Sequence, residues 1–144
     1  MKKHQLPRLI DWDLVMLQGR YAGGHESVMR NIFGHNATVI AEYVRDDYQG
    51  DEAFAYLFHD GFVAIITDYF GSCSGCDSWE GATDADAKTM ITSLVNSARL
   101  FDSVEEAALY CEFVQDKAEE WPMYTAFYLT SQLQKFSIID DGDE

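Results

Sequence analysis

The residues whose types and spacing could support chemistry lie together in one short segment, residues 71–79, which reads GSCSGCDSW. Cys73 and Cys76 have the C-x-x-C spacing with which two thiolates bind one zinc ion. A complete zinc site needs two more ligands, and the other candidates are Cys111 and four histidines. Since these do not form a second closely spaced pair, a zinc site is one interpretation of the segment among several.

The acidic surroundings of the segment oppose two further interpretations. A redox dithiol needs a stabilised thiolate, but Asp77 and Glu80 are close and no lysine or arginine lies between Arg45 and Lys88. The same acids repel a phosphate group that the glycine and serine backbone could otherwise bind. We favour a structural loop, in which the glycines supply unusual backbone angles and the cysteines are reduced and metal-free.

Catalytic motifs are not found elsewhere in the sequence. Histidine stands beside a carboxylate twice, at His25 with Glu26 and at His59 with Asp60. Adjacent side chains on a helix or a strand point apart, so neither pair is a ready-made catalytic dyad. Nucleophile-elbow, zinc-protease and dinucleotide-binding patterns are missing. The sequence therefore favours a protein that is not an enzyme and needs no cofactor, with zinc as the alternative.

The periodic segments that would position these residues predict an α+β fold. Alternating and β-branched residues predict a three-stranded antiparallel meander over about residues 37–70, with the most apolar strand placed centrally. Apolar residues at helical spacing then predict helices over about 84–101, 104–121 and 122–136. Short helices are expected in the first 36 residues. The meander should pack against the C-terminal helices.

Local signals mark where two of these helices begin. Thr83 or Asp84 would cap the first, and Ser103 with Glu106 has the spacing of a capping box at the start of the second. Cys111 falls in the apolar stripe of the second helix, where we expect a buried thiol. We expect one globular domain over residues 1–139, followed by an acidic tail at 140–144.

Charge is the outlying property of the composition. The chain of 144 residues has 25 acids and 10 bases, which gives a net charge of −15. Such a chain repels nucleic acid, whose binding depends on lysine and arginine, and is attracted to basic protein surfaces. The sequence has no apolar run long enough to span a membrane, and three cysteines do not make a secreted disulfide framework. We therefore expect a cytoplasmic protein with reduced thiols, in the host cytoplasm if the chain is viral.

The acids are grouped along the chain. Residues 46–86 hold ten acids and no lysine or arginine, and four more acids recur at helical spacing after residue 104. A solvated face that keeps the protein soluble would account for such grouping, but −15 exceeds what solubility needs. The residues expected to bind a partner are Asp46, Asp47, Asp51, Glu105, Glu112, Asp116 and Glu119.

These observations support two functional hypotheses. The first is a non-enzymatic acidic inhibitor that imitates the charge of nucleic acid and occupies the basic surface of a nucleic-acid-binding protein. Phage anti-defence proteins of similar size and charge supply the class analogy. The alternative is a small zinc-binding or thiol-dependent protein centred on Cys73 and Cys76.

Overall fold

A computed structural model describes residues 3–44, 50–70, 79, 81–115 and 123–142. Within these residues, four antiparallel strands form one sheet in the order β1-β2-β3-β4. The strands are β1 (Ala37–Val44), β2 (Gly50–Phe58), β3 (Val63–Phe70) and β4 (Arg99–Phe101). The predicted α+β fold and its antiparallel meander are confirmed, and β4 extends the sheet by one short strand.

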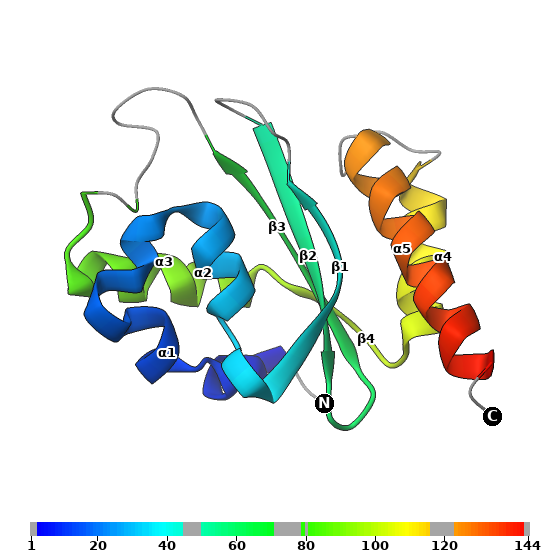
Figure 1. Ribbon diagram of the computed structural model, residues 1–144, viewed down its shortest axis with the longest axis horizontal. Coiled ribbons are helices and arrows are strands. Elements are labelled where there is room, and N and C mark those ends of the chain that lie inside the picture. Colours follow the sequence, from blue (N-terminus) through cyan, green and yellow to red (C-terminus); the bar gives the residue numbers. More distant parts are fainter. Residues whose placement is uncertain (1–2, 45–49, 71–78, 80, 116–122, 143–144) are drawn as a thin grey trace.

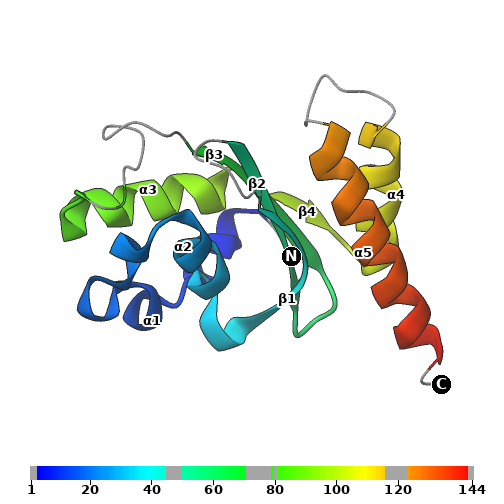
Figure 2. The same ribbon diagram turned by 45° about the horizontal axis from the view of Figure 1, so that its top comes forward.

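Helices cover the sheet from two sides (Figure 1). One layer contains α1 (Trp12–Met16), α2 (His25–Asn31) and α3 (Asp84–Asn96), together with the 3₁₀ helices η1 (Lys3–Leu9), η2 (Leu17–Gly23) and η3 (Gly34–Asn36). The other layer is the pair α4 (Val104–Gln115) and α5 (Met123–Gly142). The turned view shows the same separation, with the sheet between the two layers (Figure 2).

The central strands β2 and β3 are apolar on both faces, which explains the two helical layers. Antiparallel sheets commonly leave one face to water, and their strands then alternate between apolar and polar residues. Here the residues facing the first layer are Phe54, Tyr56, Phe58, Ala64 and Ile66. Those facing α4 and α5 are Ala53, Ala55, Val63 and Ile65. The prediction that the most apolar strand lies inside the sheet is confirmed for β3.

A compact hairpin joins the two central strands, as its turn residues predict. The Phe58 amide donates to the carbonyl of Phe62 at 3.0 Å, and the Gly61 amide donates to the carbonyl of Phe58 at 2.9 Å. Gly61 has a φ of 91°, which glycine adopts without a steric penalty. This turn fixes the pairing of β2 with β3 and therefore which side chains face each layer.

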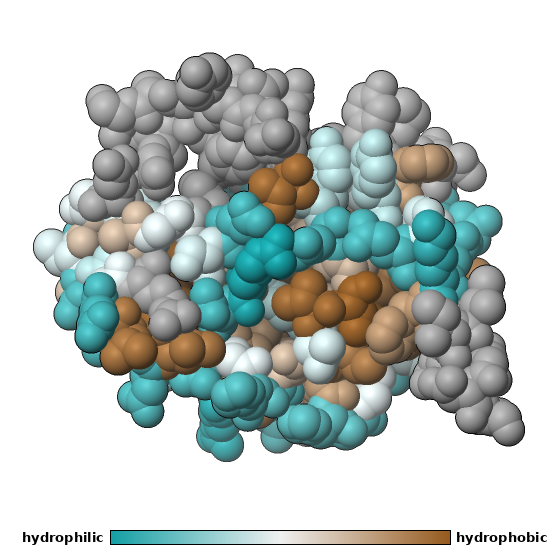
Figure 3. Space-filling view, viewed as in Figure 1, coloured by the Kyte–Doolittle hydropathy of each residue, from teal (hydrophilic) through white to brown (hydrophobic). Residues whose placement is uncertain are grey.

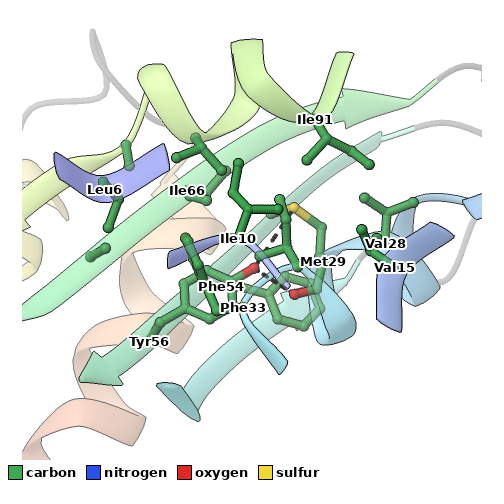
Figure 4. Close-up of a cluster of buried hydrophobic side chains, with 14 of the residues drawn as sticks. Leu6, Ile10, Val15, Val28, Met29, Phe33, Phe54, Tyr56, Ile66 and Ile91 are labelled. Carbon is green, nitrogen blue, oxygen red and sulfur yellow. Dashed lines mark hydrogen bonds between the residues drawn. The ribbon is translucent and has the colours of Figure 1, made fainter. Parts of the chain in front are cut away.

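The first layer is attached to the sheet through a buried aromatic group (Figure 4). The Tyr56 hydroxyl donates to the carbonyl of Met29 in α2 at 2.6 Å, and the Phe33 ring meets the Tyr56 ring edge-on at 4.8 Å. Burial, with the charges of Glu52 and Glu42 as weaker causes, raises the pKa of Tyr56 well above its usual value. The neutral hydroxyl thus remains a donor that holds α2 on β2.

The first long helix begins as predicted and ends earlier than predicted. Thr83 accepts from the amide of Asp86 at 3.1 Å, and the Asp86 carboxylate accepts from the Thr83 amide at 3.4 Å, so a capping box starts α3. The expected helix over 84–101 was wrong at its end, because residues 99–101 form β4. Pairing of Val63 with Phe101 adds hydrogen bonds to the edge of β3, which a continued helix could not provide.

The C-terminal helices differ from the prediction in length. The helix expected over 104–121 is present as α4, and residues 116–121 lie outside the described part of the chain. The helix expected over 122–136 begins at Met123 and continues to Gly142, so residues 140–142 of the expected acidic tail are helical. No glycine or proline interrupts the sequence between Met123 and Gly142, which permits this longer helix.

A side chain of α5 closes the outer edge of β1. The Glu42 amide donates to Oε1 of Gln132 at 2.9 Å, and Nε2 of Gln132 donates to the Glu42 carbonyl at 2.6 Å. The carboxamide therefore takes the place of a neighbouring strand at this position of an edge that would otherwise accept foreign strands. One turn earlier on α5, the Tyr128 ring stacks on Tyr43 of β1 at 5.1 Å. These two contacts fix α5 against β1.

We predict that Gln132→Leu lowers the free energy of unfolding by about 1–2 kcal/mol, because two backbone groups of Glu42 lose their partner. Gln134→Leu is the matched control, since Gln134 is exposed on the same helix, and it should change stability by less than about 0.5 kcal/mol. Hydrogen exchange of the Glu42 amide should accelerate in the first variant alone. Equal exchange rates in both variants would show that the carboxamide does not protect this edge.

Candidate interaction surface on the C-terminal helices

The orientation of α4 is fixed by the residues that it buries. Ala107, Cys111 and Val114 pack against the sheet and α5. On the side of β4, the Tyr110 ring lies 5.2 Å from the Arg99 guanidinium and 5.2 Å from the Phe101 ring. These contacts turn the opposite side of α4 towards solvent.

The start of α4 is capped in a modified form of the predicted capping box. The Glu106 amide donates to the Ser103 hydroxyl at 3.1 Å, as the spacing predicts. The Glu106 carboxylate accepts from the amide of Asp102 at 2.7 Å, one residue before the expected donor. The first bond satisfies an amide that the helix leaves free, and the second holds the residue just before the N-cap, so Glu106 contributes to the fold of α4.

Two of the predicted partner-binding acids lie on the exposed side of α4. Glu105 and Glu112 are exposed, and neither forms an ion pair with a described residue. They are two helical turns apart, so both carboxylates project from one side of the helix. The α4 sequence from Val104 to Gln115 contains no lysine or arginine. This side of α4 is therefore uniformly negative over its described length.

The other predicted acids either belong to another element or lie outside the described residues. Asp51 belongs to β2, where it is opposite Tyr69 of β3. Asp46, Asp47, Asp116 and Glu119 lie outside the described residues. The structure thus brings together Glu105 and Glu112 and assigns Asp51 to a different element.

Exposed apolar side chains share the acidic side of α4. Leu109 is 66% exposed and Phe113 is 55% exposed, although both are large and apolar. They are four residues apart and alternate with Glu105 and Glu112 along the helix. The sequence carried a signal for them, because neither fits the apolar stripe that contains Cys111. We name Glu105, Leu109, Glu112 and Phe113 the α4 outer face.

The neighbouring helix also exposes aromatic side chains. Phe127 and Tyr128 of α5 are 50% and 47% exposed, and their rings meet edge-on at 5.5 Å. Of the five exposed large apolar side chains among the described residues, four belong to α4 and α5, and Leu17 is the fifth. An apolar area is also visible along the seam between β1 and α5, bordered by polar side chains (Figure 3). Among the described residues, most of the exposed large apolar side chains therefore lie on the C-terminal layer.

Two acids of the first layer, Glu26 and Asp84, have local partners, unlike Glu105 and Glu112 of the α4 outer face. The Arg30 guanidinium contacts Glu26 and Glu42, each at 2.8 Å, and these hydrogen-bonded carboxylates raise the pKa of Arg30. The Tyr21 hydroxyl donates to Asp84 at 2.6 Å, and this bond raises the pKa of Tyr21. Some carboxylates of this layer are therefore bonded to side chains of the fold, whereas Glu105 and Glu112 face water.

The thiols give no support to a metal or redox site among the described residues. Cys73 and Cys76 lie outside them, and no group of three or more His, Cys, Asp or Glu in the described ranges is arranged to hold a metal ion. Cys111 is fully buried, as predicted, and burial raises the pKa of its thiol to about 12. Cys111 therefore acts as a small apolar residue that fills the core.

A depression of about 370 Å³ lies at the start of α3 and is open to solvent. The described residues that line it are Gly81, Ala82, Asp86, Thr89 and Met90, and the Asp86 carboxylate is engaged in the capping box. Among the described lining residues, the one carboxylate is therefore already used to start α3.

Comparisons with protein families, curated sequences and solved structures found no match to this chain. None of the helices described is both long enough and apolar enough to cross a lipid bilayer.

We predict that stability falls as pH rises above 9, partly through Cys111. The unfolded thiol loses its proton near its ordinary pKa of 9, whereas the folded thiol retains its proton up to about 12. Over that interval the native state binds more protons, and this group costs about 1.4 kcal/mol of stability per pH unit. Cys111→Ala should show a shallower decline in urea unfolding between pH 9 and 10.5. Identical slopes for the two proteins would exclude this contribution.

Proposed function

We propose that the chain is a non-enzymatic acidic binding protein that inhibits a nucleic-acid-handling protein by occupying its basic surface. The observation that carries this proposal is the exposed position of Glu105 and Glu112 on one side of α4, without basic residues in that helix. Unneutralised carboxylates held on a rigid helix attract lysine and arginine on a partner and accelerate the encounter.

The magnitude of the charge supports the same function. A net charge of −15 on 144 residues creates self-repulsion that destabilises a compact domain. A surface that competes with nucleic acid for a basic site gains from that charge, because the partner's site already binds phosphate by electrostatic attraction. Direct contact with nucleic acid is opposed by the same charge. The proposed partner is therefore a protein, and the proposed inhibition is competitive with DNA or RNA.

The test begins with capture of partners from a cytosolic extract on the immobilised chain, at low and high salt. A captured protein is purified, and its binding to the chain is measured with and without DNA or RNA. We expect competition by nucleic acid and weaker binding at high salt, because exposed charges are screened beyond about 8 Å at physiological ionic strength. Glu105→Lys with Glu112→Lys should lower the association rate about tenfold at low salt.

The matched control is the double variant Asp13→Lys with Asp60→Lys. Both aspartates are exposed and lie on other elements, so the net charge changes equally while the α4 outer face stays intact. The control should retain most of the association rate. A complex that tolerates high salt and binds nucleic acid at the same time would contradict the proposal. Loss of binding on Cys73→Ser, with the acidic variants unaffected, would favour the thiol-centred alternative.

A further inference from the structure

We infer that the α4 outer face binds a basic amphipathic helix of the partner and that Leu109 and Phe113 are its apolar anchors. This inference rests on the proposed function and specifies which structural element of the partner is recognised. Charge alone does not account for the face, since two large apolar side chains lie among the acids with 66% and 55% of their surface exposed. Apolar anchors surrounded by polar groups are typical of protein interfaces.

The spacing of the anchors fits a helix. Leu109 and Phe113 are one turn apart on a helix of 12 described residues, which is about 18 Å long. Side chains at this spacing form a ridge that packs into the groove between the ridges of a second helix. A helix that binds in this way presents apolar residues at i, i+3 or i+4, and i+7, which contact the ridge along its length.

The charges around the anchors decide the chemistry of that helix. Glu105 and Glu112 border Leu109 and Phe113, and the α4 sequence offers no compensating base. Lysine or arginine beside the partner's apolar stripe would pair with these carboxylates. Basic helices are also the elements with which many proteins enter the DNA major groove, which agrees with a nucleic-acid-handling partner.

A second copy of the chain is a poor occupant of the same face. In a symmetric dimer each side contributes the same patch, so the acids of one copy would approach the acids of the other. With −15 on each chain, the wider field is also repulsive. The charge of this face therefore favours a partner of opposite charge over a second copy.

The experiment uses the whole chain and a synthetic helical peptide of about 18 residues, built from leucine on one side and lysine on the other. A scrambled peptide of the same composition keeps the charge and removes the apolar stripe. We expect the chain to bind the amphipathic peptide more tightly. Leu109→Gln and Phe113→Gln should each weaken that binding about tenfold, with most of the effect persisting at high salt.

Leu17→Gln is the matched control, because Leu17 is 51% exposed but belongs to the first layer. It should leave peptide binding unchanged, and circular dichroism should show the same fold for all three variants. A variant that fails to fold would be replaced by Leu109→Ala or Phe113→Ala, for which the same loss is expected. Conversely, Glu105→Gln with Glu112→Gln should weaken binding mainly at low salt.

Three results would overturn the inference: no binding of the amphipathic peptide, equal binding of the scrambled peptide, or unchanged binding by the Leu109 and Phe113 variants. Self-association of the chain that depends on Leu109 would also overturn it by identifying a second copy as the occupant. These outcomes are separate from failure of the proposed function. A captured partner that competes with nucleic acid but binds the Leu109 and Phe113 variants as well as the wild type would support only the proposed function. Peptide binding without competition by nucleic acid would support only recognition of a helix by the α4 outer face.

Discussion

The two central strands carry apolar side chains on both faces, so each face must be covered by helices if the sheet is to stay out of water. On the C-terminal side, Val63 and Ile65 are buried by α4 and α5. Burial of one such side chain contributes about 1.5–3 kcal/mol, and whole domains are stable by only about 5–15 kcal/mol. The chain therefore depends on its last two helices for stability, even though those helices also carry the candidate interaction surface. The inner sides of α4 and α5 are buried against the sheet, and the outer sides carry the exposed residues of the candidate interaction surface.

This division explains how the charge is tolerated. Beside the sheet, Arg30 pairs with both Glu26 and Glu42. The Arg30 guanidinium also lies 5.7 Å from the Phe54 ring, so one cation serves two carboxylates and an aromatic face. On α4 the acids face water, where a high dielectric constant weakens their mutual repulsion. Repulsion is thus smallest where the carboxylates are most accessible to a partner.

Much of the fold could be predicted from pattern because local and long-range preferences agree. The turn residues His59 to Gly61 predict a hairpin, and the alternation of Phe54, Tyr56 and Phe58 predicts a strand with these rings on one face of the sheet. β4 was missed because Ala98 and Phe101 continue the helical stripe of α3, while the pairing that makes residues 99–101 a strand comes from β3, which is distant in sequence. In the candidate site, Glu105 and Glu112 were found from helical spacing. Leu109 and Phe113 were overlooked because apolar residues are expected inside, and exposure depends on which side of α4 the sheet covers.

The two contacts that hold α5 against β1 also determine how the C-terminal helix tolerates changes in length. Tyr128 and Gln132 are four residues apart and contact neighbouring residues of β1, Tyr43 and Glu42. Each residue inserted into a helix rotates the remainder of that helix by about 100°, so an insertion between Tyr128 and Gln132 would separate the two contacts around the helix axis. Insertions after Leu133, which is fully buried, would leave both contacts in place. The spacing of these two side chains therefore makes one turn of α5 intolerant of length variation, whereas the turns beyond Leu133 are not constrained by these contacts.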